Sequence, residues 1–251
     1  MTTPPRILSI AGSDSSGGAG IQADIKTITM LGGYAMTAIT AITAQNTLGV
    51  TDVIALSPEM VGAQIDACVG DIGVDAVKIG MLGSPEIAAI VADRLAALDA
   101  PVVFDPVMIA TSGSVLADAA TIAGFERLMA LATLTTPNVS ELEALGGRAG
   151  FAARGVTYLA KGGDAEGDVV EDSLCFPGHA PVAWRAQRIV TRHTHGTGCT
   201  LSSAIATYLG KGLELEEAIF AARQFVRAAL AAAPGFGQGH GPLGHQAVRP
   251  D

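Results

Sequence analysis

The segment from His195 to Thr200 holds the residue types with the clearest chemical potential in the chain. It follows a predicted strand and begins a helix whose apolar positions include Leu201 and Ile205. Glycines at a helix N-terminus leave backbone N–H groups free for an anion, and the helix dipole adds to that attraction. The dipole is also expected to lower the pKa of a thiol in the first turn, which makes Cys199 a candidate base or nucleophile. The alternative is that Cys199 packs as a small hydrophobic residue behind a glycine-rich cap.

An acid, an amide and a second acid stand at the expected carboxyl ends of two strands. Asp105 closes the strand Val102–Asp105, and Asn138 and Glu141 follow the strand Thr133–Thr136. Such a set can orient the water molecules that a bound Mg²⁺ retains. The alternative for Asn138 and Glu141 is helix capping, because both types are common in the first turn of a helix.

A lysine and a glycine-rich loop supply two further candidate contacts for phosphate. Lys161 precedes two glycines at the end of a predicted strand, although a solvated loop lysine is the commoner outcome. The loop Gly12–Gly20 follows a strand and opens a helix, and its last part fits the pattern G-x-G-x-x-A. A dinucleotide site needs an acid about 20 residues further on, and none lies between Asp24 and Asp52. The chain also has no P-loop motif, so the residues indicate phosphoryl transfer without one.

The elements that must position these residues alternate between strand and helix. This order predicts βαβ units and a mostly parallel sheet covered on both faces, with ligands at the carboxyl ends of its strands. Two later segments, Val169–Phe176 and Val182–Val190, predict an antiparallel pair, and the chain from Pro234 is expected to be irregular. The other predicted strands are Ile7–Ala11, Met36–Ala44, Ala76–Ile79, Val102–Asp105, Thr133–Thr136 and Val156–Ala160. The predicted helices are Ile21–Leu31, Pro58–Val69, Pro85–Leu98, Ala117–Ala130, Ser140–Leu145, Thr197–Leu209 and Leu215–Ala232, with Ser57 and Ser84 as N-caps.

Composition narrows the class of protein further. A chain of 251 residues with 49% hydrophobic residues predicts one domain over residues 1–251 with a large core. The net charge of −9 argues against binding to nucleic acid or to an anionic membrane. No run reaches the roughly 18 apolar residues of a membrane span. The three cysteines form no CxxC pair, which favours a reducing cytoplasm.

Eight short motifs occur in order along nearly the whole chain. This ordered set resembles the hydroxymethylpyrimidine/phosphomethylpyrimidine kinases of thiamine biosynthesis, in the ribokinase superfamily. The resemblance implies an α/β fold, a ribokinase-like α/β/α three-layer sandwich with a mostly parallel central sheet. The motifs are AGSDSSGGAGIQAD (Ala11–Asp24), AQNT (Ala44–Thr47), KIGML (Lys78–Leu82), DPVM (Asp105–Met108), TPN with a later Glu (Thr136–Glu141), KGG (Lys161–Gly163), HGTGCT (His195–Thr200) and GHGP (Gly239–Pro242).

The resemblance also implies an activity and a set of residue roles. The reaction is ATP- and Mg²⁺-dependent phosphorylation of 4-amino-5-hydroxymethyl-2-methylpyrimidine, and then of its monophosphate to the diphosphate. A cytoplasmic homodimer is expected, with the aminopyrimidine alcohol and ATP as its small-molecule partners. The implied roles are hydrogen bonds to the pyrimidine from Asp24 and Gln45, with Gly12 close by; a pocket wall of Ala19, Thr43, Met81 and Val107; an anion hole at Gly196 and Gly198; Cys199 as the base; Lys161 on phosphate; and Asp105, Asn138 and Glu141 on the Mg²⁺ side.

Two rival functions and two departures from the family pattern accompany this interpretation. A pyridoxal kinase or dual enzyme shares the first loop and the cysteine region, but Gln45-Asn46 favours the pyrimidine. A non-catalytic pyrimidine-binding protein has no need of Lys161 or Cys199.

The segment from Asn138 to Lys161 is shorter than the family pattern, so we expect a trimmed helix or strand on the nucleotide side. Asp164 stands where the family leads us to expect His.

Overall fold

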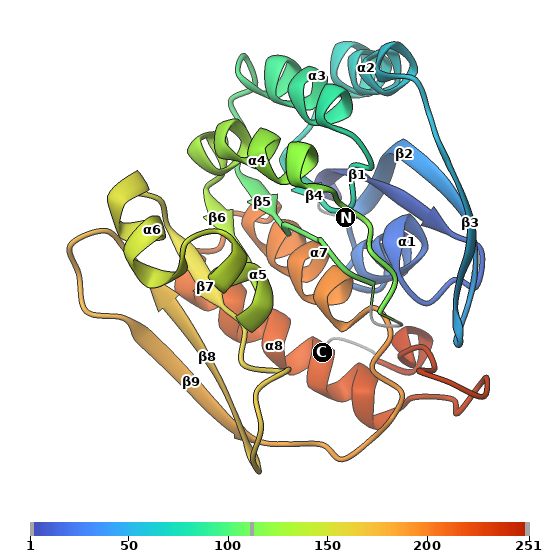
Figure 1. Ribbon diagram of the computed structural model, residues 1–251, viewed down its shortest axis with the longest axis vertical. Coiled ribbons are helices and arrows are strands. Elements are labelled where there is room, and N and C mark those ends of the chain that lie inside the picture. Colours follow the sequence, from blue (N-terminus) through green and yellow to red (C-terminus); the bar gives the residue numbers. More distant parts are fainter. Residues whose placement is uncertain (1–2, 111–112, 249–251) are drawn as a thin grey trace.

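The computed structural model describes residues 3–110 and 113–248. Within these residues nine strands form one sheet in the order β3-β2-β1-β4-β5-β6-β7-β8-β9 (Figure 1). The strands are β1 Arg6–Asp14, β2 Tyr34–Asn46, β3 Gly49–Ala55, β4 Ala76–Ile79, β5 Val102–Phe104, β6 Leu134–Thr135, β7 Tyr158–Ala160, β8 Val169–Cys175 and β9 Val182–Gln187. The helices are α1 Gly20–Met30, α2 Pro58–Ala67, α3 Pro85–Leu95, α4 Ala119–Leu131, α5 Val139–Ala144, α6 Gly147–Arg154, α7 Thr197–Gly210 and α8 Leu215–Ala231, with a π-helical turn η1 at Cys68–Ile72 and a 3₁₀ turn η2 at His245–Ala247.

The middle of the sheet is parallel and its edges are antiparallel. Strands β2, β1, β4, β5, β6 and β7 pair in parallel, whereas β3 joins β2 and β8 and β9 join β7 in antiparallel fashion. Parallel strands need crossover connections, and the helices between them supply these. The predicted mostly parallel sheet and the predicted antiparallel pair at β8 and β9 are both confirmed.

Two apolar cores lie on opposite faces of this sheet. Helices α2, α3 and α4 bury Val61, Val91 and Phe125 on one face, and α1, α7 and α8 bury Ile28, Ile205 and Ile219 on the other. In Figure 1 the first group lies above the sheet, and α7 and α8 lie below it. The fold is the α/β/α sandwich that the alternating sequence pattern predicts. No helix in the described part of the chain has the length and apolar character needed to span a membrane.

Polar side chains fix where several helices begin. Ser57 accepts a hydrogen bond from the N–H of Met60, and Ser84 accepts one from the N–H of Ile87. In each case proline follows at the first helical position, where its missing N–H costs nothing. The two predicted N-caps are confirmed, and α4 has a third at Asp118.

Strand β3 and helix α6 are elements that the sequence pattern did not predict. Strand β3 pairs with an extended β2 to form a hairpin, and most of its residues are exposed, so it shows no alternation of apolar and polar residues. Helix α6 begins and ends at glycines and buries a single large side chain, Phe151. The short Asn138–Lys161 segment contains the two helices α5 and α6 and the strand β7.

Candidate active site

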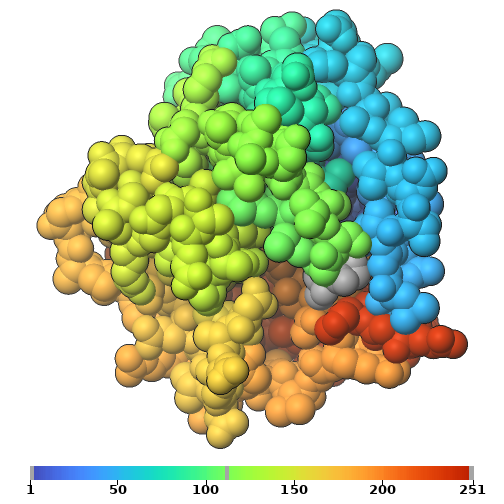
Figure 2. Space-filling model, in the orientation of Figure 1, coloured from blue at the N-terminus to red at the C-terminus, as the bar shows by residue number. Residues whose placement is uncertain are grey.

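A cavity of about 720 Å³ lies at the carboxyl ends of the parallel strands. In Figure 2 the surface is hollowed between the yellow segment around β7 and β8 and the red C-terminal segment. This is the edge of the sheet where ligands bind in open α/β folds. The cavity walls include most of the residues predicted for the site, namely Gly12, Ala19, Thr43, Gln45, Met81, Asp105, Val107, Asn138, Glu141, Lys161, Gly196, Gly198 and Cys199.

Asp24 is the predicted site residue that does not line the cavity. Its side chain is fully buried, and it accepts hydrogen bonds from Ser9 at 2.6 Å, Ser203 at 2.7 Å and Lys78 at 2.8 Å. The prediction that Asp24 hydrogen-bonds the aminopyrimidine is therefore wrong. Asp24 shares a buried helix face with Ile21 and Ile28, because residues three and four apart on a helix point the same way. That face packs against the sheet rather than toward its carboxyl edge.

Helix α7 presents its N-terminus to the cavity through two glycines. Gly196 adopts φ +86° as the N-cap, where a methyl group would lie 1.9 Å from the carbonyl oxygen of Gly18. The loop after β1 and the loop before α7 can therefore meet only if Gly196 lacks a side chain. Among the described residues no side chain caps α7, which leaves N–H groups of its first turn for a bound anion. A methyl group at Gly198 would lie 3.3 Å from Asp105 Oδ2 and 3.4 Å from Lys161 Nζ, so this glycine borders the charged part of the site.

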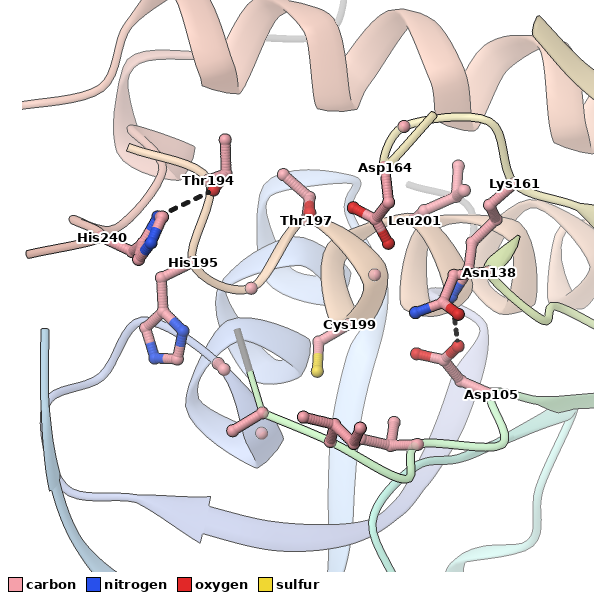
Figure 3. A pocket seen from close by; sticks show the side chains of 18 of the residues that line it. Asp105, Asn138, Lys161, Asp164, Thr194, His195, Thr197, Cys199, Leu201 and His240 are labelled. Atoms are coloured by element: carbon pink, nitrogen blue, oxygen red, sulfur yellow. Dashed lines mark hydrogen bonds and ion pairs between the residues drawn. The ribbon is translucent and has the colours of Figure 1, made fainter. Parts of the chain in front are cut away.

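The Cys199 thiol points into the cavity between His195 and Asp105 (Figure 3). Burial raises its pKa to about 11, and the negative charges of Asp24 and Asp105 act in the same direction. The ammonium group of Lys78 and the N–H of Gly20 oppose that rise but do not offset it. The expectation of a thiol pKa lowered by the helix dipole is therefore wrong, because desolvation of the thiolate outweighs the dipole. Cys199 is a neutral thiol at neutral pH.

Asp105 and Lys161 form an ion pair on the opposite side of the cavity from His195. Lys161 Nζ lies 2.7 Å from Asp105 Oδ1 and 3.9 Å from Glu141 Oε2 (Figure 3). Thr136 donates a further hydrogen bond of 3.0 Å to the same Asp105 oxygen. Burial alone lowers the pKa of Lys161, but the charges of Asp105 and Glu141 outweigh burial and raise it. Lys161 is therefore positively charged inside the cavity, as a phosphate contact requires.

Asn138 and Glu141 form a capping box at the start of α5. Asn138 Oδ1 accepts from the N–H of Glu141, and Glu141 Oε2 accepts from the N–H of Asn138, both at 2.8 Å. The capping interpretation is confirmed, and the same two residues also line the cavity. Burial raises the pKa of Glu141 to about 7; the charges of Asp105 and Asp164 add to this shift and Lys161 opposes it.

Two carboxylate oxygens at the cavity remain for a metal ion. In the described part of the chain, Asp105 Oδ2 and Glu141 Oε1 receive no hydrogen bond. The described residues contain no group of three or more acidic, His or Cys side chains that could hold a metal by themselves. Mg²⁺ usually keeps several waters and binds through one or two carboxylates together with substrate phosphates. The two free oxygens fit that kind of site.

Asp14 and His195 form a buried pair that the sequence pattern did not place in the site. Asp14 Oδ2 lies 2.8 Å from His195 Nε2, and the carboxylate also accepts from the backbone N–H groups of Ser16, Gly18 and Ala19. Burial raises the pKa of Asp14, but the hydrogen bonds from His195, Ser16 and Ala19 together outweigh burial and lower it. An aspartate followed by Ser and Gly is a common turn, and that is the signal that could have found it.

A second group of missed residues lines the end of the cavity beyond Lys161. Arg188 donates to the carbonyl oxygens of Gly163, Ala165 and Gly167, and so holds the loop that follows Lys161. Asp164, at the position where His was expected, also lines this end. The remaining walls here are Val170, Ile189, Leu201, Val226, Arg227 and Leu230. These residues come from distant segments, which no spacing in the sequence connects.

Four matches place this chain among known proteins. The hydroxymethylpyrimidine/phosphomethylpyrimidine kinase of Rhizobium meliloti (strain 1021) is 48% identical over 255 residues, covering 95% of this chain and 96% of that protein. A Bacillus subtilis pyridoxal kinase, solved as an ADP complex, has a TM-score of 0.87 and 34% identity and covers 98% of both chains. The phosphomethylpyrimidine kinase of Clostridium difficile 630 has a TM-score of 0.75 and 37% identity, over 89% of this chain and 98% of that one. A family model described as phosphomethylpyrimidine kinase matches residues 14–244. The chain therefore belongs to the phosphomethylpyrimidine kinase family and is a phosphotransferase.

Proposed function

We propose that this chain transfers the terminal phosphoryl group of ATP to the hydroxymethyl group of 4-amino-5-hydroxymethyl-2-methylpyrimidine. The same site then phosphorylates the monophosphate to the diphosphate. The observation that carries the proposal is that Gln45, Cys199 and the Asp105–Lys161 pair line one cavity with the N-terminus of α7. Related proteins with the corresponding names support the choice of substrate.

The pyrimidine would lie at the Gln45 end of the cavity. The carboxamide of Gln45 can serve the ring-nitrogen and amine edge of the substrate. Met81 and Val107 supply apolar contact for the ring, and a methyl group at Gly12 would lie 2.6 Å from Met81 Cε. Gly12 therefore leaves room for the Met81 side chain against the loop after β1. Ala19 and Thr43 complete this part of the wall.

Cys199 would orient the hydroxyl group that is phosphorylated. Because the pKa of its thiol is about 11, Cys199 is not a thiolate that removes the proton before attack. The hydroxyl proton leaves late, when the bond to the phosphoryl group is forming and the hydroxyl oxygen has become more acidic. The thiol then orients the hydroxyl group as a hydrogen-bond partner, and the proton passes to an oxygen of the transferred phosphoryl group, because a neutral thiol does not take up a second proton.

The charged end of the cavity would stabilise the transferred phosphoryl group. The first-turn N–H groups of α7 and the ammonium group of Lys161 face the same space and supply positive charge. Asp105 and Glu141 would hold Mg²⁺, directly or through water. When bound, the ion neutralises negative charge on the phosphates of ATP. Assembly as a homodimer and a cytoplasmic location remain predictions.

Product analysis tests this function. Purified protein is incubated with the hydroxymethylpyrimidine and Mg-ATP, and the mono- and diphosphate are followed over time beside ADP. We expect monophosphate first and diphosphate later, with pyridoxal turned over less efficiently in a parallel reaction. ADP release that does not depend on the pyrimidine, or a clear preference for pyridoxal, would contradict the proposal.

A further inference from the structure

Gln45 is held between two side chains at the substrate end of the cavity. Gln45 Nε2 lies 3.4 Å from His195 Nε2, and Gln45 Oε1 lies 3.2 Å from Thr43 Oγ1. His195 and Thr43 are both buried, with 4% of each residue exposed. The two ends of a carboxamide have nearly the same shape, but one is a donor and the other an acceptor. The hydrogen-bonding roles of the neighbouring groups therefore decide which end of the Gln45 carboxamide is the donor and which is the acceptor.

Asp14 determines whether Nε2 of His195 is a hydrogen-bond donor or an acceptor. Its ionised carboxylate accepts hydrogen bonds and donates none. His195 Nε2 lies 2.8 Å from Asp14 Oδ2, so this nitrogen must carry a proton. A protonated Nε2 cannot accept a hydrogen bond from the NH₂ group of Gln45. The carboxamide therefore avoids repulsion between two N–H groups only when its carbonyl oxygen is on the His195 side.

Thr43 leads independently to the same orientation. Its hydroxyl group has one proton, and the carbonyl oxygen of Ser13, at 2.9 Å, can only accept. With that proton given to Ser13, the oxygen of Thr43 is left as an acceptor for Gln45. The NH₂ group of Gln45 therefore belongs on the Thr43 side. Two neighbours from different parts of the fold require one and the same arrangement.

We propose that the Gln45 carboxamide is turned end for end relative to the placement above, and that Asp14, acting through His195, and Thr43 together lock it with its oxygen toward His195 and its NH₂ group toward Thr43. Asp14 and His195 are thus positioning residues that set substrate specificity. The inference rests on the proposed function, since Gln45 must face the substrate. It assigns the ring nitrogen of an aminopyrimidine to the Thr43 side and the exocyclic amine to the His195 side. A locked carboxamide rejects a ring whose edge carries the opposite order of donor and acceptor.

The pyrimidinone analogue, in which an oxo group replaces the exocyclic amine, tests this lock. Its edge presents a ring N–H donor beside a carbonyl acceptor, which is the reverse of the amine substrate. We expect the unmodified protein to prefer the amine by about 100-fold or more in kcat/KM, because a mismatched carboxamide leaves buried polar groups unpaired. In the double variant Thr43→Val/His195→Leu the carboxamide is free to rotate, and the preference is expected to fall by about tenfold or more.

A matched control separates specificity from general damage. Thr40 is a buried threonine on the same strand, and its hydroxyl group donates to the carbonyl oxygen of Met81 without contacting Gln45. Thr40→Val is expected to keep the amine-to-oxo preference of the unmodified protein. If the double variant does not fold, Thr43→Val alone is measured, and it is expected to lower the preference in the same direction.

The possible outcomes are distinct. An equal loss of kcat/KM for both compounds in the variants, with the preference unchanged, overturns the lock and leaves His195 a structural residue. An unmodified protein that phosphorylates both compounds equally well also overturns it, while the kinase activity stands. An unmodified protein that phosphorylates neither compound overturns the proposed function, and the inference falls with it.

Discussion

Lys78 Nζ lies 2.8 Å from Asp24 Oδ2, and neither side chain has any solvent exposure. Ser9 on β1 and Ser203 on α7 donate to the same carboxylate, which comes from α1. The pair thereby ties a strand of the sheet to the two helices whose N-termini border the cavity. Lys78 is also close enough to Cys199 to lower the pKa of its thiol. Asp24 is therefore part of the support beneath the site rather than a contact to substrate.

Breaking this ion pair is expected to destabilise the fold strongly. Lys78→Met leaves an uncompensated buried carboxylate, for which the cost is about 3–5 kcal/mol. The double variant Asp24→Asn/Lys78→Met removes both charges and is expected to recover most of that loss. Urea denaturation measures the free energy of unfolding. The exposed pair Arg127–Asp93 is the control, since Arg127→Met is expected to cost less than about 1 kcal/mol. A Lys78→Met variant no less stable than this control would contradict the prediction.

The reactivity of Cys199 should rise with pH well beyond the range of an ordinary cysteine. Only the thiolate reacts with iodoacetamide, and its fraction grows about tenfold per pH unit below the pKa. With a pKa of about 11, the alkylation rate is expected to keep rising from about pH 7 to about pH 10. The measurement uses a Cys68→Ser/Cys175→Ser background, in which Cys199 is the single thiol. A plateau near pH 8.5, the ordinary thiol value, would show a thiol that burial does not perturb.

Removal of the thiol tests the proposed place of Cys199 in the mechanism. Cys199→Ala is expected to lower kcat by about 100-fold or more for both phosphorylations, because the reacting hydroxyl group loses the side chain that orients it. Cys199→Asp asks whether a carboxylate suffices and is expected to retain more activity than alanine. Steady-state rates with both substrates measure the effect. Near-normal turnover by Cys199→Ala would remove this residue from the mechanism.

Gly198 is expected to be required for the nucleotide rather than for folding. A methyl group there would lie 3.3 Å from Asp105 Oδ2 and 3.4 Å from Lys161 Nζ, in the space proposed for phosphate. Gly198→Ala should therefore raise the KM for ATP about tenfold, with an unchanged melting temperature. Gly70→Ala is the control, because a methyl group at Gly70 meets no atom within 4 Å. An unchanged KM for ATP in Gly198→Ala would argue against an anion site at this glycine.

The sequence predicts the parts of this protein that depend on local pattern. Alternating strand and helix segments predict the sandwich, and the cap at Ser57 follows from a serine before proline. The order of the motifs brings Gln45, Lys161 and Cys199 to one sheet edge, because parallel strands end on the same side. Each of these features can be predicted from a short stretch of sequence around the residue concerned.

The misses concern interactions between residues far apart in the chain. The burial of Asp24 depends on Lys78 and Ser203, which lie on another strand and another helix. The raised pKa of Cys199 depends on how much water the folded protein excludes, and that cannot be read from the first turn of a helix. The link from Asp14 to His195 spans 181 positions, and no spacing rule connects them. Local dipoles and caps are readable from sequence, whereas desolvation is not.

His245 is expected to make the fold sensitive to mild acid. It is buried, with Nε2 2.8 Å from Thr200 Oγ1, and burial lowers its pKa from 6.5 to about 4, aided by the charge of Lys26. The folded state binds this proton less readily than the unfolded state. The free energy of unfolding is therefore not reduced by His245 above about pH 6.5. It falls as the pH drops toward about 4, by about 3 kcal/mol in total. Urea denaturation across this range measures the loss, and His245→Gln should abolish that part of it. The exposed His179 is the matched control, since His179→Gln should leave the profile unchanged; equal profiles for both variants would contradict the assignment to His245.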